Sequence, residues 1–114
     1  MVAAYFDLDV EVWVEVDELA ENRSAEVDEL GGGVYTIHLD KYWIKDAIRD
    51  ELITVIAHEM VHVKQYEQDG LDLTVVGSYM NGKEWKGDYW FSPWEVEARG
   101  YEQAFLHYFT TWTK

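Results

Sequence analysis

The sequence predicts an α+β fold in which a small, mostly antiparallel sheet packs on two long helices. Two stretches, residues 5–17 and 34–41, alternate apolar and polar residues as half-buried strands do. From about Lys41 to Gln68 the apolar residues instead recur at helical spacing, and a second helical run follows Pro93. With 114 residues, 48% of them hydrophobic, the chain has the material for one domain around a single core.

The first predicted strand has one apolar and one acidic face. Its even-numbered residues form the apolar face, namely Phe6, Leu8, Val10, Val12, Val14 and Val16. Its odd-numbered residues form the solvated face, namely Tyr5, Asp7, Asp9, Glu11, Trp13 and Glu15. This strand therefore accounts for much of the net charge of −14 without any binding partner.

Residues 18–30 predict a loop that leads into a strand, with a short helix as the alternative. The three glycines at 31–33 predict a turn, and VYTIHLDK predicts the next strand. One face of this strand carries Tyr35, Ile37 and Leu39. His38 lies on the other face, between Thr36 and Asp40, and a lone strand histidine is typical of a surface residue rather than a ligand.

The helix from about Lys41 to Gln68 has an apolar stripe formed by Ile44, Ile48, Leu52, Val55, Ile56 and Val63. Gly70 follows as a helix stop. LTVVGSYMNGKEW then predicts a hairpin, because Asn-Gly at 81–82 suits a type I′ turn. KGDYWFS predicts a loop, and the last helix begins with Ser92 as N-cap and Pro93 in the first position.

Composition limits the function classes. A net charge of −14 repels phosphate backbones, which argues against nucleic-acid binding, and no apolar run approaches membrane-spanning length. There is no cysteine to serve as a nucleophile, disulfide partner or metal ligand. The first residues show no basic segment followed by an apolar one, so a cytoplasmic protein without a signal peptide is expected.

The strongest chemical signal is HEMVH, residues 58–62, within the predicted first long helix. HExxH on a helix places two imidazoles one turn apart, where both can bind a single Zn²⁺. Glu59 falls near the centre of the apolar stripe, where a bare carboxylate costs several kcal/mol unless a cation compensates. The pattern predicts His58 and His62 as zinc ligands and Glu59 as the general base that takes a proton from a metal-activated water.

A catalytic zinc needs a third protein ligand, and positions 65 and 68 are both Gln rather than His. The last helix offers Glu95, Glu97 and Glu102. On a helical wheel, Glu95 lies at the edge of the face defined by Ala98, Phe105 and Phe109, with Glu102 two turns below it. Glu95 also lies in the first turn, where a carboxylate is favoured, so Glu95 is predicted as the ligand and Glu97 as the fallback.

HEMVH together with SPWEVEARGYE resembles the gluzincin zinc metallopeptidases, and especially short phage-encoded metallopeptidases with HEMVHVKQ and PWEIEA-like segments. The resemblance covers about residues 35–108, including the WKG before the last helix, and implies one zincin-like domain over residues 1–114. In that family an Asp or Asn four residues after the ligand glutamate supports the first histidine. Here that position is Arg99, so Glu102 or Glu51 is expected to take this role.

The resemblance also implies a Tyr or His that stabilises the oxyanion. Candidates are Tyr101, His107 and Tyr66, with Tyr101 preferred and His107 more typical of a surface histidine. The family architecture suggests that VYTIHLD forms a sheet edge that binds an extended peptide substrate, and the acidic surface favours basic segments of such a peptide.

The first functional hypothesis is therefore a zinc-dependent endopeptidase. A second hypothesis is an acidic interaction protein that mimics a DNA backbone, which explains the charge but not Glu59 in an apolar stripe. A third is a catalytically inactive fold in which the zinc is structural. The oligomeric state and the cleavage preference have no sequence signal.

Overall fold

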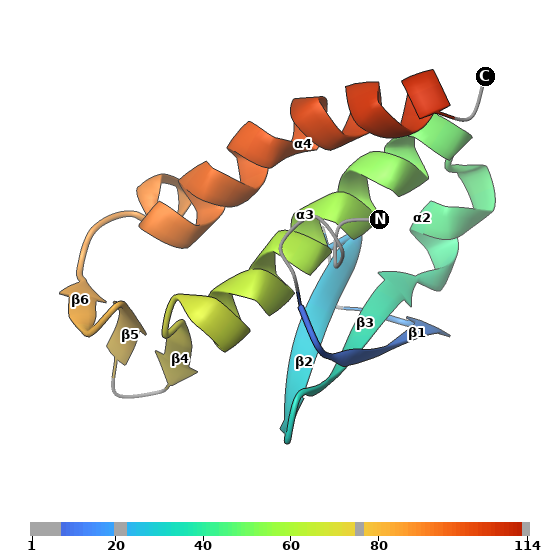
Figure 1. The fold of residues 1–114 in the computed structure, drawn as a ribbon. Coiled ribbons are helices and arrows are strands. Elements are labelled where there is room, and N and C mark those ends of the chain that lie inside the picture. Colours follow the sequence, from blue (N-terminus) through green and yellow to red (C-terminus); the bar gives the residue numbers. More distant parts are fainter. Residues whose placement is uncertain (1–7, 20–22, 75–76, 113–114) are drawn as a thin grey trace.

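Two sheets and two long helices make up the described part of the chain (Figure 1). The computed structural model describes residues 8–19, 23–74 and 77–112. The strands are β1 (Glu11–Asp17), β2 (Ala25–Gly31), β3 (Val34–Asp40), β4 (Asp72–Thr74), β5 (Gly77–Met80) and β6 (Lys83–Trp85). The helices are α2 (Lys41–Asp46), α3 (Arg49–Gln68) and α4 (Pro93–Trp112), with a 3₁₀ turn, η1 (Tyr89–Phe91), before α4. The predicted α+β class is confirmed.

The first sheet has the order β1-β3-β2, and the second has the order β4-β5-β6. β2 and β3 are antiparallel and join through a turn at Gly32 and Gly33, both with positive φ. β1 pairs with β3 in parallel, with Glu15 opposite His38, while both pairings of the second sheet are antiparallel. The described sheets are therefore mostly antiparallel, as predicted. The expectation that VYTIHLD is a sheet edge is wrong, because β3 is the central strand.

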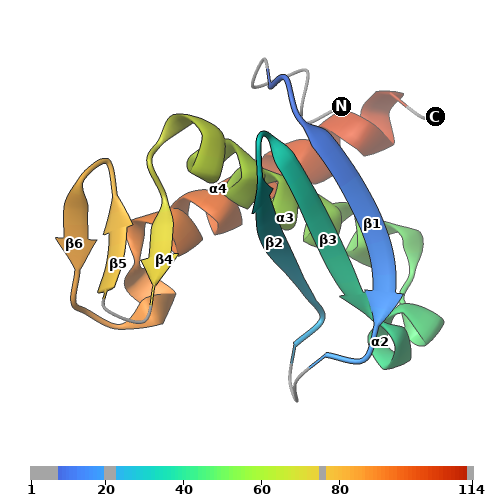
Figure 2. The same ribbon diagram turned by 90° about the horizontal axis from the view of Figure 1, so that it is seen from below.

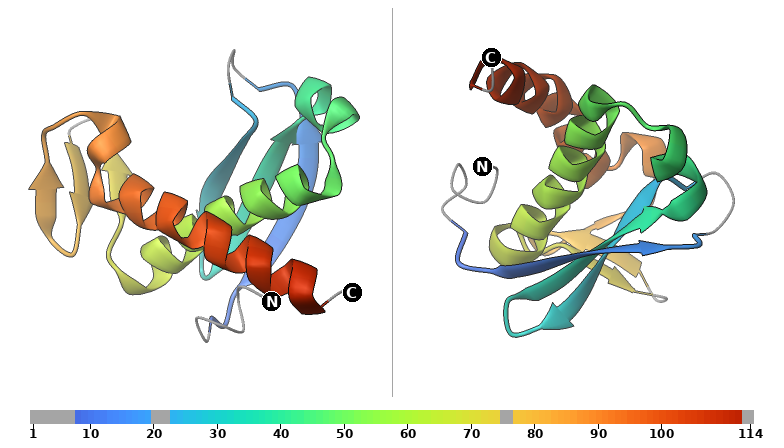
Figure 3. Two further views of the ribbon diagram at one scale, coloured as in Figure 1. Left: turned by 90° about the horizontal axis from the view of Figure 1, so that it is seen from above. Right: turned by 90° about the vertical axis from the view of Figure 1, so that its right-hand side faces the viewer.

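Helix α3 is the middle layer of the molecule (Figures 1 and 3). The sheet formed by β1, β3 and β2 packs on one side of α3, and α4 packs on the other. The core contains Tyr35, Ile37 and Leu39 of β3, Ala57, Met60, Val61 and Val63 of α3, and Ala98 and Phe105 of α4. The predicted inward face of β3 is thus confirmed, and the HExxH segment lies against the core on two sides.

β1 lies at the edge of its sheet (Figure 2), and its apolar face is only partly covered. Leu8, Val10 and Val12 pack against the core. Val14 and Val16 are 53% and 55% exposed, because α3 contacts β2 and β3. The expected burial of the whole apolar face is therefore wrong for its end. Phe6, Tyr5 and Asp7 lie outside the described residues.

The predicted helix from Lys41 to Gln68 is two helices. Ala47 and Ile48 have extended backbone, with ψ of 135° and 165°, and Ile48 is 61% exposed instead of lying on the buried stripe. α2 follows β3 directly, capped by Asp40 through a 3.0 Å bond from the Trp43 N–H. The chain then turns back so that α3 crosses the sheet (Figure 1), which one straight helix starting at the strand end does not allow.

The predicted turns and helix ends are confirmed. Gly70 has a φ of +65° just beyond the end of α3, and the Leu71 N–H donates to the Gln65 carbonyl at 3.1 Å. Asn81 and Gly82 have φ values of 53° and 77°, as the turn between β5 and β6 requires. α4 begins at Pro93, directly after Ser92, as predicted, while the Ser92 hydroxyl donates to the Tyr89 carbonyl at 2.7 Å, a bond to η1 rather than a cap on α4. Within the described ranges, every helix is too short or too polar to cross a membrane.

Candidate metal centre

Three side chains converge between α3 and α4: His58, His62 and Glu95. Each offers one ligand atom, and the three atoms lie within 4.8 Å of one another. His58 Nε2 lies 3.1 Å from Glu95 Oε2, and His62 Nε2 lies 3.1 Å from Glu95 Oε1. Helix α3 holds the two imidazoles one turn apart, with ring centroids 4.9 Å apart. The structure thus brings together the three residues that the sequence selected as metal ligands.

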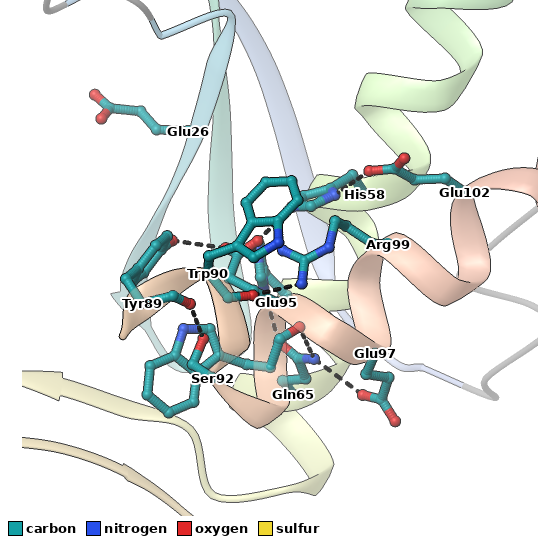
Figure 4. A network of polar contacts seen from close by, with 12 residues as sticks. Glu26, His58, Gln65, Tyr89, Trp90, Ser92, Glu95, Glu97, Arg99 and Glu102 are labelled. Carbon is teal, nitrogen blue, oxygen red and sulfur yellow. Dashed lines mark hydrogen bonds and ion pairs between the residues drawn. The ribbon is translucent and has the colours of Figure 1, made fainter. Parts of the chain in front are cut away.

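A hydrogen-bond acceptor holds the other ring nitrogen of each imidazole. His58 Nδ1 lies 2.6 Å from Glu102 Oε1 (Figure 4), and His62 Nδ1 lies 2.7 Å from Gln65 Oε1. The Gln65 amide nitrogen donates to the Trp94 carbonyl and to Glu97, both at 2.9 Å, which fixes its oxygen towards His62. In the neutral form that binds a metal ion, each ring would therefore carry its proton on Nδ1 and direct the Nε2 lone pair towards Glu95.

This arrangement suits a bound cation. Two imidazole lone pairs and a carboxylate are all acceptors, and they repel one another unless positive charge lies between them. Protonating both rings would place two like charges in rings whose centroids are 4.9 Å apart, at a largely buried site. One divalent ion satisfies all three groups. Two zinc–ligand bonds of about 2.0–2.1 Å in a tetrahedral site span about 3.3 Å between ligand atoms, close to the separations described above.

The pKa shifts of His58 and Glu95 also favour positive charge at this site. Burial lowers the pKa of His58, but its hydrogen bonds with Glu95 and Glu102 outweigh burial and raise this pKa to about 9. Burial raises the pKa of Glu95, yet the hydrogen bonds from His58, His62 and Tyr89 outweigh it and lower the pKa on balance. Glu95 therefore stays ionised, as a ligand to a metal ion must be.

Glu95 and Glu97 occupy different surroundings. Glu95 is 7% exposed and accepts a 2.6 Å hydrogen bond from the Tyr89 hydroxyl. Both carboxylate oxygens of Glu97 lie 3.0 Å from Lys64 Nζ, and one of them also accepts the Gln65 amide. The geometry therefore favours the predicted ligand Glu95 over the fallback Glu97.

A cleft of about 360 Å³ opens beside these residues. Glu59 lines it and is 7% exposed, and burial raises the pKa of its carboxyl although both histidines oppose the shift. α3, α4, η1, the start of β4 and the edge strand β2 contribute to the walls. The lining residues outside the three converging side chains include Ser24, Ala25, Glu26, Val27, Val55, Tyr66, Leu71, Trp94 and Glu102.

Of the two residues expected to replace the family's Asp or Asn, the structure selects Glu102. Glu102 lies seven residues after Glu95, which places both on one face of α4, and its carboxylate reaches His58. Glu51 lies in the first turn of α3, where its carboxylate accepts the Ile48 N–H at 3.4 Å. The side chain of Arg99 stacks on Trp90, 3.7 Å from the ring centroid, and donates to the Trp90 carbonyl.

Among the described residues, the tyrosines that line the cleft are Tyr66 and Tyr89. Tyr101, the preferred oxyanion candidate, stacks on Phe105 with ring centroids 5.5 Å apart and packs against the core instead. His107 is exposed on α4, as expected of a surface histidine. The geometry therefore favours Tyr66 or Tyr89 over Tyr101 for a contact with a ligand in the cleft.

Two residues of the site escaped the sequence analysis. Gln65 is fully buried and lies three residues after His62. Residues at this spacing share a helix face, so the sequence could have predicted a contact between the Gln65 and His62 side chains. Tyr89 lies in a segment expected to be a loop, and nothing in its local pattern indicates a contact with Glu95.

Comparisons of the chain with protein-family models, with curated proteins and with solved structures found no match. The candidate metal centre therefore stands on the side chains of this chain alone: two imidazoles and a carboxylate that converge beside the buried Glu59.

Proposed function

We propose that this chain is a zinc-dependent endopeptidase of gluzincin type. The observation that supports it best is the convergence of His58 Nε2, His62 Nε2 and a Glu95 carboxylate oxygen within 4.8 Å. These residues would hold the ion, and Glu59 would face the reacting groups from the same helix. A bound Zn²⁺ supplies a Lewis acid that polarises the scissile carbonyl and lowers the pKa of a water ligand.

In this proposal Glu59 accepts the proton of the attacking water and later delivers it to the leaving amide nitrogen. Its pKa is raised by burial, which makes its carboxylate a stronger base than a solvated glutamate. Glu102 and Gln65 keep the two imidazoles oriented, because each accepts a hydrogen bond from Nδ1. The chain's own residues thus position the ion and move the proton.

The edge strand β2 offers a binding mode for the substrate. Ala25, Glu26 and Val27 of β2 line the cleft, and the outer edge of this strand faces away from β3. An extended peptide added at this edge would lie beside the metal centre and gain main-chain hydrogen bonds. The net charge of −14 favours basic over acidic substrate segments.

The test combines metal analysis with a digest of a peptide library. We expect about one zinc per chain and cleavage by the wild type. Glu59→Gln should retain zinc but lose turnover, because an amide of the same shape cannot accept the proton. Near-normal turnover by this variant would exclude Glu59 as the base.

The same two measurements separate the alternatives. Zinc without turnover of any peptide would indicate the catalytically inactive zinc-bound fold. Absence of zinc, with tight binding to a DNA-binding protein, would indicate that the chain is an acidic interaction protein that mimics a DNA backbone.

A further inference from the structure

The three consecutive residues of η1 are large, aromatic and exposed. Tyr89, Trp90 and Phe91 have exposed fractions of 57%, 59% and 64%. Exposed aromatic residues that lie together are typical of binding surfaces rather than of ordinary protein surface. We call these three residues the aromatic rim.

The aromatic rim is continuous with the cleft. Tyr89 lines the cleft and donates its hydroxyl proton to Glu95 at 2.6 Å. Trp90 stacks on Arg99, and helical periodicity places Arg99 beside the row formed by Glu95 and Glu102, two residues that line the cleft. Trp90 and Arg99 therefore lie beside the part of the cleft wall that Glu95 and Glu102 form (Figure 4), while β2 forms another wall.

Several contacts fix the rim in place. The Trp90 N–H donates to Asp88 at 2.8 Å, and the Ser92 hydroxyl donates to the Tyr89 carbonyl at 2.7 Å. Arg99 adds the stack on the Trp90 ring and a hydrogen bond to the Trp90 carbonyl. The Tyr89 and Trp90 rings, held by Glu95 and Arg99, therefore lose little conformational entropy when a ligand packs on them.

We propose that the aromatic rim binds an aromatic or large aliphatic side chain of the substrate polypeptide, next to the bond at the metal centre. This inference rests on the proposed peptidase function and adds a preference for segments with a large apolar side chain. Any polypeptide that enters the cleft along α4 passes the rim, because Tyr89 belongs to both. The net charge of −14 opposes two other occupants, a second copy of this chain and an anionic lipid surface.

The experiment compares Trp90→Ala and Phe91→Ala with Tyr42→Ala. Tyr42 is a matched control, because it is an aromatic residue, 63% exposed, on α2. The substrates are two peptide series with one shared scissile bond, flanked on either side by Phe or by Ser. We expect the wild type to prefer the Phe-flanked series. Trp90→Ala should raise KM for that series about tenfold and reduce the preference for Phe-flanked over Ser-flanked peptides by a similar factor, whereas Tyr42→Ala should keep the wild-type kcat, KM and zinc content.

Each outcome has a defined meaning. Equal KM values of the wild type and both rim variants for the Phe-flanked series overturn the inference alone. A wild type that cleaves neither series overturns the proposed function, and the inference with it. If Trp90→Ala also disturbs zinc content, Phe91→Ala decides, because it leaves the stack between Trp90 and Arg99 intact. If KM is unchanged but the rim variants bind zwitterionic vesicles less than the wild type does, the rim binds lipid and the inference is overturned. If KM is unchanged but the rim variants no longer form a dimer that the wild type forms, the rim binds a second copy and the inference is overturned.

Discussion

At the scale of single residues, Glu95 links three elements. It is part of α4, its carboxylate contacts His58 and His62 of α3, and it accepts the hydroxyl of Tyr89 of η1. Glu97, two residues later, instead contacts Lys64 and reaches the centre through Gln65. Glu95 thus contacts both histidines of the candidate metal centre directly, whereas Glu97 contacts it only through Gln65. The zinc affinity of variants at the two positions should therefore differ.

Glu95→Gln should lose at least about a hundredfold in zinc affinity, because a neutral amide replaces an ionised oxygen ligand. Glu97→Gln changes the charge equally, but it removes an ion pair with Lys64 and weakens a contact to Gln65, neither of which is a ligand to the ion, so its affinity should fall by no more than about tenfold. Competition with a chelator at fixed pH gives both values. The reverse order would mean that Glu97 binds the ion.

Glu102→Gln should weaken zinc binding about tenfold, because an amide oxygen, a weaker acceptor, replaces the carboxylate oxygen that orients His58 Nδ1. Glu51→Gln is the matched control, since it removes the same charge from a residue whose carboxylate accepts the Ile48 N–H. The same competition assay applies. Equal effects in the two variants would show a general loss of negative charge rather than a specific role for Glu102.

At the scale of elements, His38 connects the three strands of the first sheet. It lies on β3, its Nδ1 contacts Asp17 of β1, and its Nε2 lies 2.9 Å from Asp28 of β2. Glu15, 3.8 Å away, adds a further negative charge, and Glu26 is its neighbour on β2. The histidine expected to be a surface residue is thus largely enclosed by carboxylates from both edge strands.

This arrangement predicts a pH-dependent stability. The hydrogen bond to Asp17 outweighs burial and, with Asp28, raises the pKa of His38 above its ordinary value of 6.5. A raised folded-state pKa stabilises the fold below the ordinary pKa, and this contribution is lost as the pH rises through the folded-state pKa. His38→Gln should therefore reduce the free energy of unfolding by on the order of 1 kcal/mol near pH 5.5, and by less at pH 9.

Urea unfolding of both proteins across that pH range checks the prediction. His107→Gln serves as the control, because it removes an exposed histidine from α4. A destabilisation by His38→Gln that does not change with pH would mean that the charge of the ring contributes nothing.

At the scale of the whole molecule, the candidate centre joins α3 to α4, and α3 is also the layer on which the sheet packs. Metal binding should therefore stabilise the entire fold. Free zinc at 1,000 times its Kd adds about 4 kcal/mol to the free energy of unfolding, provided that the unfolded chain does not bind it. A chelator should lower Tm in the wild type but not in the double variant His58→Ala, His62→Ala. A wild-type Tm that ignores both zinc and chelator would contradict the metal centre.

Much of the fold and of the candidate site could be predicted from the sequence, because buried positions recur at the spacing of a strand or a helix and are mostly apolar. Alternation gave the faces of β3, and helical spacing placed Glu59 on the buried side of α3. The same wheel separated Glu95 from Glu97, since one side of α4 must face the core. Turn chemistry at Gly70 and Asn81 is equally local, because positive φ limits the residue choice.

Tertiary structure decided everything that depends on which distant segments meet. The parallel pairing of β1 with β3 leaves β1 at an edge, so Val14 and Val16 are exposed although their pattern is that of a core face. Glu102 rather than Glu51 reaches His58 because α4 packs against α3 (Figure 1). Tyr89 reaches Glu95 because η1 folds back over the start of α4. Periodicity records how deeply a residue is buried, but only packing decides which partner it is buried against.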